Sequence, residues 1–258
     1  DQLTRRIRPT RKWDDIVLSG DRLDLLRSIV DRVHHDATVY DEWGYPAIPS
    51  RGLVALFSGP SGTGKTLAAE IVAGELGLDL FKLDLSSVVS KYIGETEKHL
   101  DQLFDAAGAG NSVLFFDEAD SLFGKRSEVK DARDRYANIE VSYLLQRLEA
   151  YDGVVVLATN FEKNVDEAFL RRIHVRIEFA MPGPGERERI WRQAFPPAAP
   201  LAPDVDFGWF ARQFEIAGGA IRNASVSAGF IAASAGTLIT SDAIVAAVAR
   251  EYRKLGRL

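Results

Sequence analysis

Short apolar runs alternate along the first part of the chain with segments whose apolar residues recur at helical spacing. A continuous apolar run of roughly four to eight residues is typical of a strand buried on both faces. Such runs predict strands over residues 53–57, 113–116 and 154–157, and two short apolar segments interrupted by charged residues predict two more, over residues 80–83 and 175–179. Helical spacing between the strands is clearest over residues 65–76 and 95–107. This alternation predicts an α/β fold with a mostly parallel sheet flanked by helices on both faces.

The pattern changes after Met181-Pro-Gly-Pro-Gly185, a run that breaks both helices and strands. Only helical spacing remains beyond it, over residues 186–195, 205–214, 219–235 and 241–255. The last of these segments carries one apolar stripe made of Ile244, Val248, Tyr252 and Leu255. We therefore expect a large α/β domain over residues 1–184 and a small all-α domain over residues 185–258.

The first twelve residues include five basic side chains. This favours a solvated, partly disordered arm or linker over residues 1–12, with a binding patch as the alternative. The chain begins at Asp1 rather than at Met, which is compatible with an upstream domain.

Composition narrows the possible partners. The net charge of −5 gives no basic field for nucleic acid, and the absence of cysteine excludes disulfides, thiolate metal sites and cysteine nucleophiles. No apolar run approaches the roughly 18 residues that span a bilayer, and no signal peptide is visible. We expect a cytoplasmic protein that binds neither nucleic acid nor membrane.

The chain carries a glycine-rich segment, Gly59-Pro-Ser-Gly-Thr-Gly-Lys-Thr66, between the first predicted strand and the helix that follows it. It matches the G-x-x-x-x-G-K-T phosphate loop, in which backbone N–H groups surround an anion at the start of a helix. Lys65 would place its charge on the β- and γ-phosphates, and the Thr66 hydroxyl would ligate Mg²⁺. The predicted ATP contacts are Gly59, Pro60, Ser61, Gly62, Thr63, Gly64, Lys65, Thr66 and Leu67.

Polar residues end two of the other predicted strands. Asp117 and Glu118 follow the run at 113–116, and Asn160 follows the run at 154–157. Parallel α/β sheets bind ligands at the carboxyl ends of their strands. We expect Asp117 to hold the Mg²⁺ shell, Glu118 to act as the base that polarises water, and Asn160 to orient that water or contact the γ-phosphate.

The phosphate loop, the Asp-Glu strand and the Thr-Asn strand, followed by a helical domain, resemble the AAA+ ATPases over nearly the whole chain. The resemblance implies hydrolysis of MgATP and a sheet of order 5-1-4-3-2, counting the predicted strands along the chain. It also implies a helical lid over the nucleotide and a homo-oligomeric ring, usually a hexamer, with each nucleotide between neighbours.

Further residues are assigned by the resemblance alone. Ile16 lies in a segment similar to the one that contacts adenine. Lys91, Tyr92 and Ile93 are similar to the pore loop of the katanin and spastin group, where the aromatic residue grips an extended protein client; an ordinary core or surface tyrosine is the alternative.

Phe169-Leu-Arg-Arg172 resembles the arginine-finger segment, although the usual Pro-Gly is absent and two arginines are adjacent. The choice between Arg171 and Arg172 stays open, and both also suit the end of a helix. Gly218 and Arg222 resemble the lid motif that places an arginine on the nucleotide, which many protein-remodelling members lack.

Two segments leave alternatives open. Residues 124–136 are highly charged and are equally compatible with a solvated loop and a second pore-facing loop. Residues 90–97 and 250–256 are most similar to AAA+ ATPases associated with bacterial contractile injection systems, which would make the client part of a phage-tail-like particle.

Three functions follow as hypotheses. The first is an ATP-driven motor that threads or remodels a protein client. The second is a slow nucleotide-gated assembly factor that does not thread its client. The third is a DNA-loading protein, which the acidic balance disfavours.

Overall fold

The structure is a computed structural model that describes residues 4–46, 50–85, 96–108, 112–120, 143–160, 170–254 and 256. The chain divides into two compact units. The first unit comprises Asp1–Trp13, Ser19–Gly59 and Lys65–Phe179, and the second comprises Asp14–Leu18, Pro60–Gly64 and Ala180–Leu258. The described part of the first unit is α/β, and that of the second is built from helices.

A mixed sheet of six strands forms the centre of the first unit, in the order β1-β3-β4-β5-β2-β6. The strands are β1 (Thr4–Ile7), β2 (Leu53–Ser58), β3 (Asp79–Asp84), β4 (Ser112–Asp117), β5 (Val154–Thr159) and β6 (Val175–Glu178). All neighbouring pairs are parallel except β1 with β3. The five predicted strands are therefore confirmed, and their order is the predicted 5-1-4-3-2.

β1 corrects the expectation of a partly disordered arm at this position. Thr4–Ile7 pairs antiparallel with β3, with Arg6 opposite Phe81. The Arg6 guanidinium also contacts the Asp79 carboxylate, with Nε 2.9 Å from Oδ2. Backbone pairing and this ion pair order the segment. Its basic composition alone favoured disorder, and the pairing could not be predicted locally because the partner lies more than seventy residues away in sequence.

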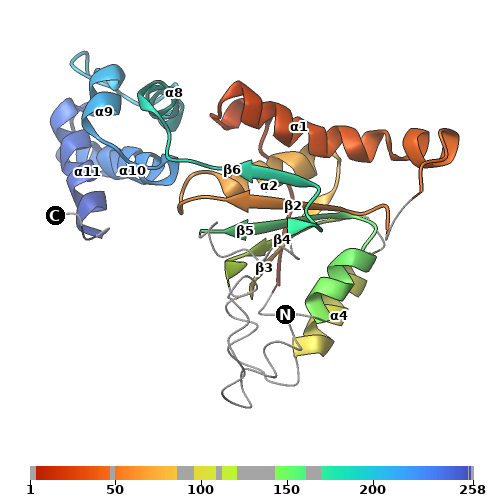
Figure 1. The fold of residues 1–258 in the computed structure, drawn as a ribbon. Helices are drawn as coiled ribbons and strands as arrows, with labels where there is room; N and C mark the ends of the chain where they lie inside the picture. Colours follow the sequence, from red (N-terminus) through yellow and green to blue (C-terminus); the bar gives the residue numbers. More distant parts are fainter. Residues whose placement is uncertain are drawn as a thin grey trace. The chain divides into compact units, whose positions relative to one another are not determined.

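Helices cover both faces of the sheet (Figure 1). One face carries α1 (Gly20–His34) and α2 (Lys65–Glu75), and the other carries α4 (Thr96–Ala107) and a helix over residues 143–150. Leu100, Leu103 and Phe104 of α4 are buried, as their helical spacing predicts. They form one apolar cluster with side chains of β4 and β5 such as Phe116 and Leu157. Two shorter helical segments are η1 (Trp13–Asp15) and η2 (Thr38–Glu42).

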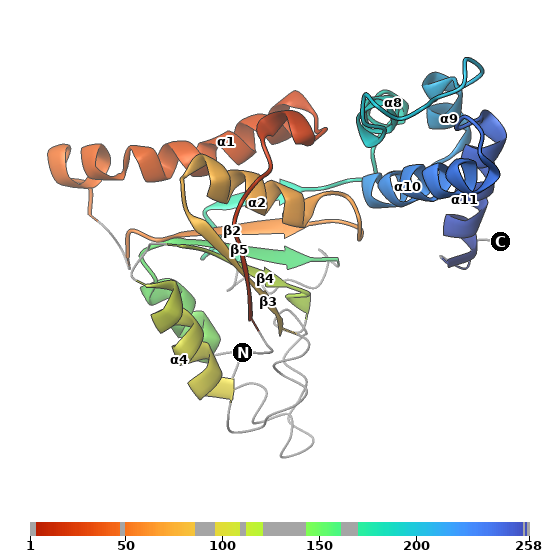
Figure 2. The ribbon, with the colours of Figure 1, turned by 180° about the vertical axis from the view of Figure 1, so that it is seen from behind.

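The second unit is a helical bundle of α8 (Pro184–Ala194), α9 (Phe207–Gln213), α10 (Gly218–Ala235) and α11 (Ser241–Lys254). These helices match the four predicted ones to within a few residues. α10 and α11 lie side by side (Figure 2). The bundle buries Trp191, Phe210, Ile221, Ile244 and Val248 in a core of its own. None of the helices in the described part of the chain is both long and apolar enough to cross a bilayer.

Candidate functional site

The glycine-rich segment forms the turn between β2 and α2. Gly59, Gly62 and Gly64 all have positive φ, at 137°, 79° and 108°. A Cβ on Gly59 would lie 2.1 Å from the carbonyl oxygen of Phe179, so a larger residue cannot occupy this position without displacing the backbone. Positive φ at three glycines of one turn is typical of loops whose backbone N–H groups surround an anion.

Lys65 begins α2 and is almost buried, with 8% of its surface exposed. Its ammonium group donates to the Gly59 carbonyl and, at 3.1 Å, to Oδ1 of Asn160. Burial lowers the pKa of Lys65, and the charges of Asp117 and Asp120 act against that shift. A buried ammonium group beside a glycine turn fits an anionic ligand, which would restore the solvation that the side chain has lost.

The carboxylate of Asp117 ends β4 and has a partner at each oxygen. Oδ1 accepts a hydrogen bond from the Glu118 N–H at 3.1 Å, and Oδ2 lies 2.6 Å from the Lys82 ammonium nitrogen. The Asp117 side chain is 27% exposed, so solvent still reaches it.

Glu118 follows β4 with a φ of 53°, which makes it the one non-glycine residue with positive φ among those the structure describes. This conformation is unfavourable for an L-residue with a Cβ, and such strain concentrates at functional sites. The Ala119 N–H immediately after it donates to the carbonyl of Ala158 at 2.8 Å, which ties the turn to β5. The result is an exposed Glu118 side chain on a turn fixed at both ends.

Asn160 lies just beyond β5 and is positioned by Asp120. The Asp120 carboxylate accepts from the Thr159 hydroxyl and, at 3.2 Å, from the Asn160 N–H. Asn160 in turn accepts from Lys65. The structure therefore brings together Lys65, Asn160 and the acidic end of β4 through Asp120.

The first unit offers donors that fit a magnesium ion bound together with phosphates. Thr66 follows Lys65 at the start of α2 and is partly exposed, and Asp117 is partly exposed at the end of β4. Across the described residues, no group of three or more acidic or histidine side chains could hold a metal by itself. Magnesium bound with a nucleotide takes one or two protein ligands and completes its shell with phosphate and water, so the small donor set is compatible with it.

The second unit holds the other predicted nucleotide contacts. Ile16 is buried at 4% exposure, and its Cδ1 would lie 3.9 Å from a Cβ on Gly64. The Gly219 N–H donates to the Gly62 carbonyl at 2.8 Å, which fixes the first turn of α10 against the glycine-rich loop. Gly218 begins α10, and Arg222 lies one turn later with an exposed side chain.

The two candidate finger residues are both exposed and lie just after a helical residue, Leu170. Arg172 pairs with the carboxylate of Glu149 in its own chain. The predicted client-binding residues Lys91, Tyr92 and Ile93, and the charged segment 124–136, lie outside the described residues.

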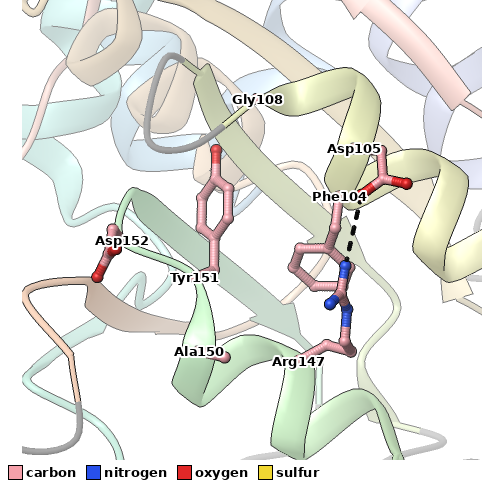
Figure 3. A pocket seen from close by; sticks show the side chains of 7 residues that line it. All are labelled: Phe104, Asp105, Gly108, Arg147, Ala150, Tyr151 and Asp152. Carbon is pink, nitrogen blue, oxygen red and sulfur yellow. Dashed lines mark ion pairs between the residues drawn. The ribbon is translucent and has the colours of Figure 1, made fainter.

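A cavity of about 320 Å³ lies near the amino ends of β4 and β5, opposite the ends that carry Asp117 and Asn160. The Arg147 guanidinium carbon lies 5.1 Å from the centroid of the Phe104 ring, and the guanidinium contacts Asp105 at 3.8 Å (Figure 3). The Tyr151 hydroxyl points away from Arg147 and donates to the Ser112 carbonyl at 2.9 Å. Burial raises the pKa of Tyr151 to about 12. This cavity has no glycine turn like that of residues 59–64 and no buried ammonium group among its described residues.

The sequence did not identify two residues of the candidate site, Lys82 and Asp120. Asp120 could have been identified from the sequence, since it is the last acid of Asp117-Glu-Ala-Asp120. Lys82 could not have been identified from the sequence, because only strand pairing brings it beside β4, where it lies opposite Phe115.

Known proteins share sequence with most of this chain. Residues 55–181 match the model of the ATPase family associated with various cellular activities (AAA). An uncharacterized AAA family ATPase, y4kL, of Sinorhizobium fredii is 34% identical over 69% of this chain and 52% of its own length. Proteasome-activating nucleotidase 1 of Halobacterium salinarum is 32% identical over 87% of this chain and 56% of its own.

A third relative, vacuolar protein sorting-associated protein 4 of Dictyostelium discoideum, is 36% identical over 56% of this chain and 33% of its own length. The chain's matches thus span from a third to about half the length of these relatives. The region matched by the family model contains most of β2, the glycine-rich turn, β4 with its acidic end, and β5 with Asn160. This chain carries a domain of the AAA ATPase family.

Proposed function

We propose that the chain binds MgATP at the glycine-rich turn and hydrolyses it. The observation that carries this proposal is the almost buried Lys65, which lies beside the turn and contacts Asn160. Burial disfavours its charge, and a triphosphate is the ligand that would compensate for this most strongly. Its family membership supports the same ligand.

Binding would use three kinds of group. The backbone N–H groups of residues 60–64 surround the phosphates, Lys65 neutralises their charge, and Thr66 and Asp117 hold the magnesium ion. The bound metal would supply charge stabilisation on the phosphate oxygens. On the resemblance alone, we assign Ile16, Gly218 and Arg222 of the second unit to nucleotide contacts as well.

Hydrolysis would depend on Glu118 and Asn160. Glu118 accepts the proton of the attacking water from its exposed position on a turn with positive φ. Asn160 orients the water or the γ-phosphate. Asp120 positions Asn160 by accepting its N–H.

The direct test is Glu118→Gln, which keeps the shape of the side chain and removes the base. We expect ATP turnover to fall by roughly 10²- to 10⁴-fold while ATP affinity is retained. Glu75→Gln is the matched control, because Glu75 is at the end of α2 and pairs with Trp13. Normal turnover in the Glu118 variant would remove Glu118 from the role of base.

The proposed active form is a homo-oligomeric ring, which we take to be a hexamer, with an arginine supplied to each nucleotide by the neighbouring subunit. Arginine fingers accelerate GTPases by roughly 10³- to 10⁵-fold. Subunits carrying Arg172→Ala, or in parallel Arg171→Ala, are to be mixed with Lys65→Ala subunits. Recovery of turnover in the mixture identifies the arginine that acts in trans. Rings that form without recovery at any ratio argue against that arginine.

The proposed substrate is a protein that the ring remodels or threads. Relatives include a proteasome-activating nucleotidase and a vacuolar protein sorting-associated protein, which are 32% and 36% identical to this chain over the matched regions. The Glu118→Gln variant should trap the client with ATP bound. Adding Tyr92→Ala should release it if the tyrosine grips the client, whereas unchanged capture would contradict threading.

The second candidate function is the slow assembly factor that binds and releases its client without threading. It is favoured if client capture depends on ATP and survives the Tyr92 substitution. A client from a contractile injection system is a narrower proposal, and it rests on the resemblance of residues 90–97 and 250–256. Identification of the trapped client by mass spectrometry tests it.

A further inference from the structure

A lysine on β3 contacts the carboxylate that we assign to the metal. In the parallel pairing of β3 with β4, Lys82 lies opposite Phe115 and Asp84 lies opposite Asp117. Successive side chains on a strand alternate between the two faces of a sheet, so all four share one face. Two carboxylates that face each other across neighbouring strands repel, and Lys82 is the cation nearest to them in the pairing.

The contact between Lys82 and Asp117 is short and partly shielded from solvent. The ammonium nitrogen lies 2.6 Å from Asp117 Oδ2, and the two side chains are 29% and 27% exposed. The same nitrogen lies 5.5 Å from the centroid of the Phe115 ring. The ring and the carboxylate together hold the lysine in one place, so the ion pair is stronger than a fully exposed one.

Both oxygens of Asp117 already have a donor in this arrangement. The Glu118 N–H contacts Oδ1 at 3.1 Å, and Lys82 contacts Oδ2. The backbone contact is sufficient to orient the carboxylate and would remain if Lys82 were replaced. The main consequence of Lys82 is therefore its charge, which removes negative potential from the oxygen closest to it.

We propose that Lys82 competes through its charge with the magnesium ion for the Asp117 carboxylate and so lowers the affinity of the site for metal. This inference rests on the proposed function, which assigns Asp117 to the metal. Lys82 would also pair again with Asp117 when metal leaves with the product. The chain then avoids an unpaired acid at this edge and holds the metal loosely enough for rapid exchange.

The charge of Lys82 determines whether replacing it should strengthen or weaken metal binding. Lys82 repels a divalent cation with twice the energy that it would show toward a monovalent one, which weakens metal binding. Lys82 also helps to orient the Asp117 carboxylate, but the Glu118 N–H partly duplicates that contribution. Replacing Lys82 with a neutral side chain of similar length should therefore tighten metal binding. For a partly exposed pair we expect the change to be roughly three- to tenfold.

The test measures binding of Mn²⁺, used as the probe, to the chain saturated with ADP, by the electron paramagnetic resonance signal of the free ion. Lys82→Met and Lys82→Gln should bind Mn²⁺ roughly three- to tenfold more tightly than the original chain, and Lys82→Arg should bind it about equally. Lys98→Met, which removes a charge from an exposed position on α4, should leave the affinity unchanged. Thermal unfolding of each variant checks that it is folded.

Equal or weaker Mn²⁺ binding in both neutral variants would overturn the inference. Asp117→Asn separates this failure from a failure of the proposed function. If Asp117→Asn weakens Mn²⁺ binding while the Lys82 variants do not change it, only the role of Lys82 is wrong. If Asp117→Asn has no effect either, the assignment of Asp117 to the metal is wrong as well.

Discussion

The two ends of the central strands β4 and β5 differ in the environment of their polar groups. At the amino end, the buried Tyr151 hydroxyl donates to the Ser112 carbonyl, and Arg147 faces Asp101 and Asp105. At the carboxyl end, Lys65 is almost buried and its charge is disfavoured, and Glu118 has a strained backbone.

The difference indicates which end binds ligand. At the amino end, the Tyr151 hydroxyl is hydrogen-bonded and the Arg147 guanidinium has carboxylates nearby, although the buried Arg147 Nε makes no hydrogen bond. At the carboxyl end, the disfavoured charge of Lys65 and the strained backbone of Glu118 cost stability, and such features persist where a ligand benefits from them. Substitutions at the carboxyl end should therefore affect nucleotide binding, and substitutions at the amino end should affect folding.

The largest effect is expected for Lys65→Met. Removing the charge that contacts the phosphates should weaken ATP binding on the order of a thousandfold. Because burial disfavours the charged form of Lys65 in the folded chain, its pKa is lowered and the group does not stabilise the fold at neutral pH. The melting temperature should stay the same or rise. Calorimetric titration measures the ATP affinity and thermal unfolding measures the melting temperature. Unchanged ATP affinity would show that Lys65 does not contact the nucleotide.

At the amino end, Tyr151→Ala should act in the opposite way. Tyr151 is 6% exposed and packs against Phe104 with ring centroids 5.7 Å apart. Its removal should lower the free energy of unfolding by about 3 kcal/mol. ATP affinity of the folded variant should remain within about twofold, since Tyr151 precedes β5 whereas Asn160 of the candidate site follows it. Urea denaturation measures the first, and a large loss of ATP affinity would contradict the distinction.

A smaller effect concerns alkaline pH. The pKa of Tyr151 is raised from 10.0 to about 12 in the folded chain, so the folded state keeps the proton longer than the unfolded state does. The stabilisation is complete below about pH 10 and is lost as pH rises through about 12. The free energy of unfolding should fall by roughly 2 kcal/mol across this range relative to Tyr151→Phe. Equal pH profiles for both chains would show that the hydroxyl is not buried as described.

The smallest effect is expected for Arg147→Met. The guanidinium lies 3.2 Å from Asp101 and 3.8 Å from Asp105, and both aspartates are at least partly exposed. Exposed pairs of this kind contribute about 1 kcal/mol or less, and methionine keeps the packing on Phe104. A double-mutant cycle with Asp105→Asn should give a coupling energy below about 0.5 kcal/mol. A coupling several times larger would mean that the amino end holds a functional charge network.

Local pattern was sufficient for much of the fold. β2, β4 and β5 were predictable because each is a continuous apolar run buried on both faces, and each leads into a polar residue at its carboxyl end. The order of the strands came from the family resemblance, since no local pattern specifies which strands pair. The helices of the second unit were predictable from their apolar spacing and the break before Pro184.

Other features depend on contacts distant in sequence. β1 is rich in arginine and is ordered by pairing with β3, which its own composition does not indicate. α1 buries Leu26, Ile29 and Val30 but was not predicted, because polar residues dominate its sequence. The backbone strain at Glu118 has no sequence signature, since glutamate does not mark positive φ as glycine does. The proximity of Lys82 to Asp117 follows only from the pairing of β3 with β4.

Hydrogen exchange with and without MgATP tests the contrast between the two ends most directly. Exchange should become roughly tenfold slower on ATP binding in peptides covering residues 59–67, 117–120 and 158–160. Peptides covering residues 104–108 and 147–153, at the amino end, should exchange at unchanged rates. Protection confined to the amino-end peptides, with none at the glycine-rich turn, would contradict it.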